Sequence, residues 1–487
     1  MENTRNFSLK ELANSIQGEI YGSDDFFNDE NFIGRFTVLN DANKGDIVIR
    51  HWINGKGIEI AKGKNISCLI TENPKEDALE VAEKLNFPLI VTDKIELANG
   101  FALKWTIETY SPNSKNIAIT GTNGKSTSSH LIYHILKESN FKVFTNTDSE
   151  SEFNTLIDPI VSKLISDKIN SEGDQDFLVI EISEVQGWLG SLMKNHAGIM
   201  ANAINPDVGI VTNIALDHIG LVNSIDEVFD EISGFVNALD KGTFVYNGDD
   251  ELVLKLLDYK NKSVNSFPFS MDKNKNINLY YDNEAIFYND NLVLNKEELP
   301  FQSNHFIQNI LTAIATCISL DIPINQISKA IKNYHSLNRR FSKLSDEPLI
   351  IDDFAHNPDG IKATIIETSK LVPENGNFYI INAIRGSRGE ELNKFNAEAI
   401  SDVVTDDFHL ILSSSNDVVD KLNFVEVNEK NTFLKVLNDK NIDYVHYDEL
   451  FDALNETYLN SSTEDVILLI GAQGMDPAEE LLKKIIK

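Results

Sequence analysis

The sequence predicts an α/β protein of three units, in which a central parallel sheet with a phosphate-binding loop is flanked by two smaller α/β units. Three observations lead to this fold. The length of 487 residues suits about three domains of ordinary size. Short apolar runs alternate with helical patterns along the chain, as in parallel sheets that helices cover on both faces. A turn with the sequence Gly-Thr-Asn-Gly-Lys-Ser-Thr, residues 121–127, connects one such run to a helical pattern.

The charge balance and the cysteine content exclude several classes of protein. The chain has 43 Lys and Arg residues against 75 Asp and Glu residues, a net charge of −32. Nucleic acids and anionic membranes bind basic surfaces, so we expect neither as a partner. The two cysteines, Cys68 and Cys317, fit a reducing compartment, and the sequence has neither a signal-peptide pattern nor a membrane-spanning apolar run. We therefore expect a cytoplasmic, monomeric protein that does not insert into membranes.

The first predicted unit, residues 1–112, is a small α/β domain. Ser8 opens a helix with the pattern of a capping box. The segments 46–50, 68–71 and 88–92 are predicted strands, with a helix over 77–85. The unit has no group of residues typical of catalysis, so a substrate-binding role is favoured. A polar stretch with Pro112 is the predicted linker to the next unit.

The second predicted unit, residues 113–343, begins with the phosphate-binding loop between a strand over 116–120 and a helix over 128–136. Successive backbone N–H groups and the positive end of the helix point at one anion in this geometry. Lys125 would bridge the terminal phosphates, and the Ser126 or Thr127 hydroxyl would hold Mg²⁺. The usual pattern has a glycine where Ile119 stands, so the loop is a shortened variant. The alternative is a glycine turn with an incidental Lys-Ser pair.

Polar side chains stand at the carboxyl ends of the other predicted strands of this unit. These strands cover 142–145, 177–182 and 208–213, followed by a helix over 224–239, a β-rich segment over 263–300 and helices over 305–320 and 324–334. Glu181, Asn213, Asp217 and His218 fall at or just beyond strand ends, where parallel sheets bind ligands. Because Mg²⁺ prefers oxygen ligands, Ser126 and Glu181 are candidate ligands, with His218 on the same edge. Alternatively, Glu181 caps a neighbouring helix and His218 is a packing or turn residue.

The third predicted unit, residues 344–487, is another doubly wound α/β domain. Its predicted strands are 349–353, 377–384, 408–412 and 465–470, with helices over 359–371 and 477–486. Near its start, Arg340 could reach a transferring phosphoryl group as the domains close, and Asp353 could bind a ribose or an attacking amine. Arg385 and Arg388 suit a carboxylate or a phosphate, because guanidinium pairs bidentately with both. A surface turn is the alternative for these two arginines.

Taken together, these motifs resemble the Mur ligase family over nearly the whole chain. The family comprises three-domain ATP-dependent amide ligases, including the peptidoglycan peptide synthetases, folylpolyglutamate synthetase and the C-terminal part of cyanophycin synthetase. The motifs that carry the resemblance are the loop 121–127, Thr212 to His218 (the TN…DH motif), Asn309 on a helix, Arg340 at the hinge, Asp353 to Gly360 (similar to DYAHNPDG) and Leu469 to Gly474.

The resemblance implies a mechanism and a set of site residues. ATP phosphorylates a substrate carboxylate to an acyl phosphate, an amine attacks it, and ADP and phosphate leave. The implied catalytic residues are Lys125, His218, Arg340 and Asp353. The implied ATP-binding residues are Gly121, Thr122, Asn123, Gly124, Lys125, Ser126, Thr127, Asn309, Arg340 and Asp353. The implied Mg²⁺ ligands are Ser126, Glu181 and His218. The implied substrate-binding residues are Asn154, Thr155, His356, Asn357, Arg385 and Arg388.

Departures from individual family members narrow the expected substrate. Asn205 is identified with the position of a carbamylated lysine in many peptidoglycan ligases, and the diaminopimelate motif DNPR is absent. The segment 385–389 instead resembles the cyanophycin-type third domain. This mixture of features from muramyl-tripeptide and cyanophycin-type ligases is most similar to archaeal pseudomurein peptide ligases.

We therefore expect a peptide ligase of cell-wall synthesis that joins an amino acid to a nucleotide-linked or peptide carboxylate. Three alternatives stay open. The first is the methanogen ligase that acts on the nickel-tetrapyrrole cofactor. The second is a nucleotide-gated binding protein that does not ligate, suggested by the missing lysine. The third is a kinase that stops after phosphorylation.

Overall fold

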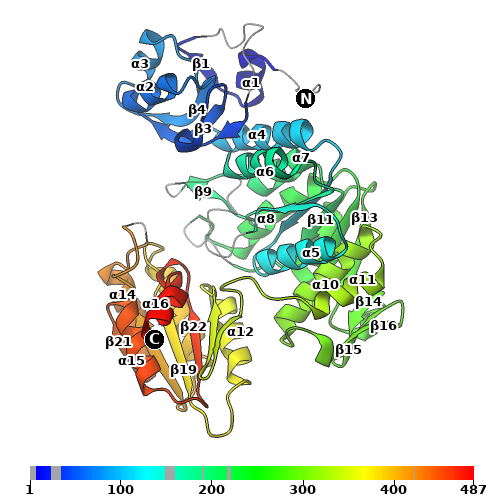
Figure 1. Ribbon diagram of the computed structural model, residues 1–487, viewed down its shortest axis with the longest axis vertical. Helices are drawn as coiled ribbons and strands as arrows, with labels where there is room; N and C mark the ends of the chain where they lie inside the picture. Colours follow the sequence, from blue (N-terminus) through cyan, green and yellow to red (C-terminus); the bar gives the residue numbers. More distant parts are fainter. Residues whose placement is uncertain are drawn as a thin grey trace.

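The computed structural model describes residues 7–23, 34–147, 159–188, 191–216, 221–421 and 423–486. The described part of the chain forms three main sheets of five, nine and six strands, in chain order, and a two-stranded ribbon. Helices pack around each sheet, and the three units follow one another from the blue end of the chain to the red end (Figure 1). The α/β fold with a central parallel sheet is therefore confirmed.

The first sheet has the strand order β1-β5-β4-β3-β2 and is parallel except for β1. Its strands are β1 (Glu19–Tyr21), β2 (Phe36–Thr37), β3 (Ile47–Ile53), β4 (Cys68–Pro74) and β5 (Leu89–Val91). Its helices are α1 (Leu9–Ser15), α2 (Gly55–Gly63) and α3 (Ala78–Lys84). The capping box at Ser8 is confirmed. Helix α2 was not predicted, because its three glycines weaken the helical signal.

Helix α4 (Ile95–Tyr110) belongs to two cores at once. Ala98 and Trp105 lie in the core of the first unit, whereas Leu103 and Ile107 lie in the core of the central unit. Beside the helix, Arg35 pairs with Asp167 and so ties the first unit to the second. A helix buried on two sides has no single apolar stripe, which explains why its sequence gave no clear helical pattern. The first and central units are thus joined by a shared helix.

The central sheet has the order β16-β15-β14-β13-β12-β11-β6-β8-β7, and all its pairings are parallel except those of β15 with β14 and with β16. Its strands are β6 (Lys115–Thr120), β7 (Val143–Thr145), β8 (Phe177–Glu181), β11 (Val208–Val211), β12 (Thr243–Asn247), β13 (Asn265–Ser270), β14 (Leu279–Tyr281), β15 (Ala285–Tyr288) and β16 (Asn291–Asn295). Its helices are α5 (Lys125–Glu138), α6 (Pro159–Glu172), α7 (His196–Ile204), α8 (Ile225–Asn237), α9 (Glu251–Lys255), α10 (Asn304–Ser319) and α11 (Ile324–Lys332). The β-rich segment predicted over 263–300 is confirmed.

Both faces of the central sheet are covered. In β6, Ile117 and Ile119 contact the core that α5, α10 and α11 form, and Ala118 contacts the opposite core under α6, α7 and α8. This burial on two faces explains the continuous apolar runs in the sequence. Among the described helices, none combines the length and the apolar character that a membrane crossing requires.

His196, the first residue of α7, makes the stability of the fold depend on pH. Its side chain is buried, neither ring nitrogen has a hydrogen-bond partner among the described residues, and burial lowers its pKa to about 4. An unfolded histidine titrates near 6.5, so this stability is present above that pH and is lost as the pH falls toward 4. Between pH 7.5 and 5, we expect a loss of about 2 kcal/mol from this residue.

Urea unfolding of the wild type and of His196→Leu at these two pH values checks this expectation. The variant should lose less stability on acidification than the wild type by that amount. Replacement of the exposed His335 by leucine is the control and should leave the difference unchanged. Equal losses in the wild type and His196→Leu would contradict the assignment.

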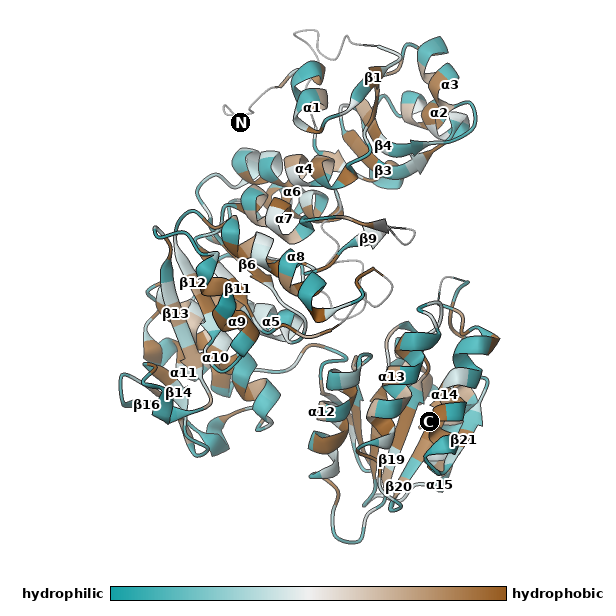
Figure 2. Cartoon of the chain, turned by 180° about the vertical axis from the view of Figure 1, so that it is seen from behind, coloured by the Kyte–Doolittle hydropathy of each residue, from teal (hydrophilic) through white to brown (hydrophobic). Residues whose placement is uncertain are grey.

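The third sheet has the order β17-β18-β22-β19-β20-β21 and is parallel except for β17. Its strands are β17 (Ser342–Asp346), β18 (Leu349–Asp353), β19 (Phe378–Ala383), β20 (Phe408–Ser413), β21 (Tyr444–Tyr447) and β22 (Val466–Ile470). Helices α12 (Pro358–Ser369), α13 (Glu390–Ser401) and α14 (Val427–Asp439) cover one face, and α15 (Leu450–Asn460) and α16 (Ala478–Ile485) the other. Apolar residues concentrate on the strands (Figure 2).

Candidate active site

The loop 121–127 has the strand–turn–helix geometry that the sequence predicted. Gly121 follows β6, and Lys125 begins α5. Gly121 and Gly124 have φ values of +122° and +83°, which glycine adopts without strain. A Cβ atom on Gly124 would also lie 2.2 Å from Oδ1 of Asn309, so a side chain here would displace the Asn309 amide. Asn309 on α10 therefore lies directly against the loop.

Asn213, the second residue of the TN…DH motif, fixes the shape of the loop. Its Oδ1 accepts a hydrogen bond from the Asn123 backbone N–H at 2.9 Å, and its Nδ2 donates to the Asn123 carbonyl at 2.8 Å. Thr122 accepts through Oγ1 from the Ala215 N–H at 2.9 Å. The Thr-Asn part of the motif thus positions the loop backbone. Asp217 and His218 of the same motif lie outside the described residues.

Lys125 is held within the loop by three acceptors. Its ammonium donates to the Gly121 carbonyl at 2.7 Å, to the Thr122 carbonyl at 3.0 Å and to Oε2 of Glu184 at 2.7 Å. The side chain of Glu184 is fully buried. Sequence reasoning missed Glu184. The available signal was a second acid three residues after Glu181, just past the end of the same strand.

Ser126, Glu181 and Arg340 meet beside Lys125. The Ser126 hydroxyl donates to Oε1 of Glu181 at 3.1 Å and lies 3.2 Å from Nη2 of Arg340, which donates to it. Glu181 is 1 % exposed, and burial raises its pKa, while Lys125 and Arg340 oppose this shift. The structure therefore brings together three of the predicted site residues from different parts of the chain.

This cluster fits an oxygen-ligated cation. Oε2 of Glu181 is buried and has no hydrogen-bond partner among the described residues. A buried carboxylate oxygen without a donor is costly, and a cation beside it would remove that cost. No group of three His, Cys, Asp or Glu side chains suited to a metal occurs in the described part of the chain. Mg²⁺ at nucleotide sites needs few protein ligands, because it keeps waters and binds phosphate oxygens.

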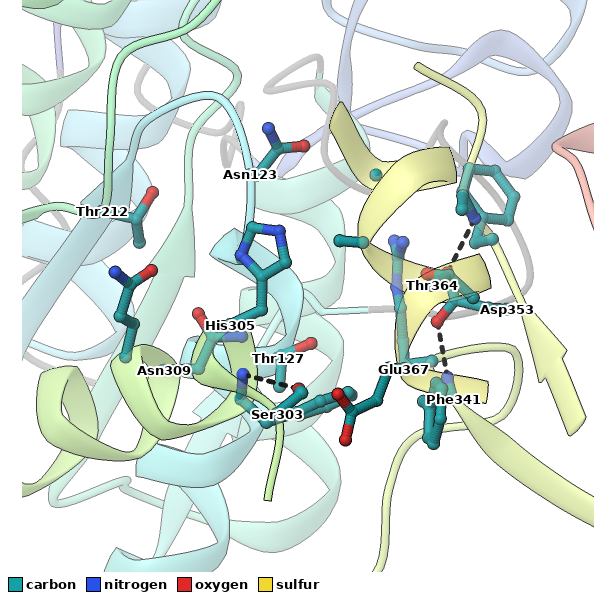
Figure 3. Close-up of a pocket in the computed structure, with 18 of the residues that line it drawn as sticks. Asn123, Thr127, Thr212, Ser303, His305, Asn309, Phe341, Asp353, Thr364 and Glu367 are labelled. Carbon is teal, nitrogen blue, oxygen red and sulfur yellow. Dashed lines mark hydrogen bonds between the residues drawn. The ribbon is translucent and has the colours of Figure 1, made fainter. Parts of the chain in front are cut away.

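A pocket with about 880 Å³ of free space, part of it open to solvent, lies between the central and third units. Figure 3 shows side chains from the loop and α10 on one side and from the hinge and α12 on the other. The labelled lining residues are Asn123, Thr127, Thr212, Ser303, His305, Asn309, Phe341, Asp353, Thr364 and Glu367. The predicted residues Gly124, Arg340, His356 and Asn357 also line it.

Asp353 shapes the wall of this pocket through its own hydrogen bonds. Its carboxylate accepts from the Phe341 N–H at 2.7 Å, the Ala355 N–H at 2.9 Å and the Thr364 hydroxyl at 3.2 Å. Burial raises the pKa of Asp353, and Arg340 and these donors lower it. Asp353 thus anchors the turn that follows β18 while it faces the pocket. Its contact with a nucleotide or an amine stays a prediction.

The paired arginines of the hinge have partners in different units. Arg339 is buried in the third unit, where it pairs with Asp352 and Asp476. Arg340 instead reaches Ser126 in the loop. The Phe354 ring lies 4.9 Å from the guanidinium of Arg339 and 4.8 Å from that of Arg340. Arg339 therefore fixes the hinge to the third unit, from which Arg340 extends to the central unit.

The remaining predicted substrate residues are placed only in part. Asn357 donates through Nδ2 to Oδ1 of Asn123 at 3.0 Å, a second contact between the two units. Arg385 and Arg388 follow β19, at the carboxyl edge of the third sheet where β18 also ends with Asp353. Neither arginine lines the pocket. The backbone N–H groups of residues 387–389 donate to the carboxylate of Glu429. These N–H groups are therefore already occupied by an internal carboxylate. Asn154 and Thr155 lie outside the described residues.

The identification of Asn205 with a metal-bridging lysine is wrong. Asn205 ends α7 and precedes β11, so it lies at the amino end of that strand. The loop 121–127 follows the carboxyl end of β6, and the two strands are parallel. Asn205 is therefore on the edge of the sheet opposite to the loop. The observation that suggested a non-ligating protein no longer supports it.

Comparison with known proteins identifies the family. The Mur ligase middle domain matches residues 119–317, and the Mur ligase, glutamate ligase domain matches residues 339–473. UDP-N-acetylmuramate–L-alanine ligase of Clostridium acetobutylicum is 27 % identical over 330 residues, 65 % of this chain and 66 % of that protein. The chain thus spans about two thirds of the length of this relative.

Two solved structures share the fold. MurF from Acinetobacter baumannii has a TM-score of 0.69 at 16 % identity, covering 99 % of this chain and 98 % of that one. A pseudomurein peptide ligase type C from Methanothermus fervidus has a TM-score of 0.56 at 20 % identity, covering 91 % and 95 %. Two family domains in the expected order, with the loop and the hinge arginine in contact, show that the chain belongs to the Mur ligase family of ATP-dependent acid–amino-acid ligases.

Proposed function

We propose that this chain joins the amine of an amino acid to the carboxylate of a nucleotide-linked or peptide substrate, with conversion of ATP to ADP and phosphate. The contact between Arg340 and Ser126 carries the proposal. Through it the third unit supplies a guanidinium to the phosphate loop of the central unit. Domain closure of this kind brings two substrates together and completes a site for a developing phosphoryl charge.

The proposed chemistry has two steps. A carboxylate oxygen of the acceptor takes the γ-phosphoryl group of ATP, the bond to the β-phosphate breaks, and an acyl phosphate and ADP form. The amine nitrogen then attacks the acyl carbon, phosphate leaves with the bonding electrons, and the amine loses a proton. Lys125 and Arg340 would offset the charge on the phosphoryl oxygens. Closure of the third unit would exclude water, which would otherwise hydrolyse the acyl phosphate.

Ser126 and Glu181 would hold Mg²⁺ beside the phosphates, as the buried Oε2 of Glu181 supports. The bound ion supplies positive charge to the phosphate oxygens. His218 stays a predicted third ligand. Asn309 and the α10 side of the pocket would take the adenosine, because Asn309 borders both the loop and the pocket.

For the substrate, we propose a cell-wall precursor of the pseudomurein type. The names of the relatives support muramate-linked precursors in general, and the shared fold with a pseudomurein peptide ligase supports this narrower class. The nickel-tetrapyrrole ligase stays the second candidate. A cytoplasmic, monomeric enzyme completes the proposal; both cysteines are reduced and buried.

Phosphate release from ATP and Mg²⁺ tests the proposal. The enzyme is incubated with a UDP-linked glutamyl peptide and one amino acid at a time from a panel. The masses of the products are measured by mass spectrometry. We expect release that depends on one amino acid and a product heavier by one residue. Amine-independent hydrolysis would contradict a ligase, and a stable phosphorylated acceptor would indicate a kinase. The absence of phosphate release with every amino acid of the panel would favour the tetrapyrrole as the acceptor.

Arg388→Ala is expected to raise the KM for the amino substrate about tenfold, because one charge-assisted hydrogen bond is lost. The KM for ATP should not change. Steady-state phosphate release against amino-acid concentration measures both constants. Lys394→Ala removes an exposed cation from the adjacent α13 and is the control. An unchanged KM in Arg388→Ala would assign the 385–389 segment to a surface turn.

A further inference from the structure

Among the described residues, the cations of the phosphate loop have buried carboxylates beside them. Two cations, Lys125 and Arg340, lie beside two buried carboxylates, Glu181 and Glu184. The cradle therefore attracts phosphates with its backbone N–H groups but with no excess of side-chain charge. The chain as a whole adds a net charge of −32, which also opposes an incoming nucleotide.

Lys125 cannot reach a phosphate while it keeps all its present contacts. A lysine ammonium has three N–H donors. Here they go to the carbonyls of Gly121 and Thr122 and to Glu184, at 2.7, 3.0 and 2.7 Å. A phosphate oxygen must replace one of these acceptors or share the charge with Glu184. In either case the negative charge around Lys125 exceeds the positive charge.

Glu184 then needs another cation. Its side chain is fully inaccessible to solvent, so water does not compensate a lost or shared partner. The neighbouring Glu181 presents the buried Oε2 that has no partner within the described ranges. A divalent cation that arrives with the nucleotide can neutralise both carboxylates and the phosphates together.

We propose that Glu184 is the resting partner of Lys125 and, when the nucleotide displaces it, becomes the second carboxylate of the cation site beside Glu181. This inference rests on the proposed function, because it assumes that ATP enters this loop. It adds to that function that the nucleotide binds tightly only together with its metal. Metal-free ATP meets a lysine that is already neutralised.

The test is the magnesium dependence of nucleotide affinity, measured without turnover. The full chain and Glu184→Gln are titrated calorimetrically with adenylyl imidodiphosphate, in EDTA and in excess Mg²⁺. The quantity compared is the dissociation constant measured in EDTA divided by the one measured in excess Mg²⁺. We expect this ratio to fall about tenfold or more in Glu184→Gln, because one buried negative charge is removed from both the metal and the lysine. A ratio within threefold of the wild-type value would overturn the inference, including the case where both affinities fall equally.

A second readout reports on the cation directly. Mn²⁺ replaces Mg²⁺, and free Mn²⁺ is followed by electron paramagnetic resonance in the presence of the same analogue. Glu184→Gln should weaken Mn²⁺ binding about tenfold, whereas Glu298→Gln, which removes an exposed carboxylate paired with Lys332, should not. Unchanged Mn²⁺ affinity would overturn the proposal.

Two further controls separate the possible failures. If Glu184→Gln does not fold, Glu184→Asp keeps the charge and should keep the wild-type ratio within threefold; a tenfold fall in this variant would contradict the role of charge. If the wild type binds no analogue under either condition, the proposed function itself fails. If it binds with a metal dependence that Glu184→Gln shares, only the role of Glu184 fails.

Discussion

Lys125→Ala is expected to lower kcat for amine-dependent phosphate release by about 10³-fold, the most that one positioned donor to a developing oxyanion typically contributes. The ammonium is already within the loop, 2.7 Å from the Gly121 carbonyl, so a small movement would bring it to the phosphates. Steady-state assays at saturating substrate give kcat, and calorimetry gives nucleotide affinity. Retention of a tenth or more of the wild-type kcat would refute the assignment of the loop.

The control for this variant takes account of Glu184. Removing Lys125 leaves a buried carboxylate without its ammonium, which by itself destabilises the protein. The double variant Lys125→Ala/Glu184→Gln restores the charge balance and should regain stability in urea unfolding but not turnover. Lys137→Ala changes an exposed lysine on the same helix and should retain full activity. Recovery of kcat in the double variant would mean that Lys125 acts on stability alone.

Arg340→Ala is expected to lower kcat by about 10³-fold while nucleotide affinity changes less than kcat. Arg340 extends from the third unit, so it would contact the phosphoryl group only in the closed arrangement that its bond to Ser126 represents. Pre-steady-state phosphate release separates this chemical step from product release. Arg340→Lys keeps a charge without the planar fork and should recover only part of the loss.

Lys483→Ala removes an exposed cation from α16 of the third unit and is the control, which should leave kcat unchanged. A fall in nucleotide affinity as large as the fall in kcat would contradict a role in the phosphoryl-transfer step. It would place Arg340 in ground-state binding instead.

Sequence reasoning recovered features that are encoded locally. The loop 121–127 could be predicted because its glycines, its lysine and its hydroxyls are contiguous, and their spacing alone sets the turn into α5. Most strands of the three sheets could be predicted because parallel strands buried on two faces are continuous apolar runs. The strands β1, β2, β12, β17 and β21 were not predicted. Helices α4 and α7 were missed for the same physical reason, since a helix buried on two sides has no polar stripe either.

Features that depend on contacts between distant segments could not be predicted. Glu184 is one acid among many in the sequence, and only its 2.7 Å contact with Lys125 distinguishes it. The sequence presents Arg339 and Arg340 as a pair, but Arg339 pairs with the buried carboxylate of Asp352, which only the third sheet places nearby. Asn205 was misassigned because distance along the chain does not tell at which edge of a sheet a residue lies.

Because α4 packs in the cores of both the first and the central unit, it limits where chimeras with related proteins can be joined. In a chimera joined at residue 112, the foreign helix would place its own residues where Leu103 and Ile107 contact the native central core. A cut before Ile95 would instead leave Ala98 and Trp105 of the native helix to face a foreign first sheet. A transplanted first unit therefore has to bring α4 together with the surface of α6 and α7 on which it packs.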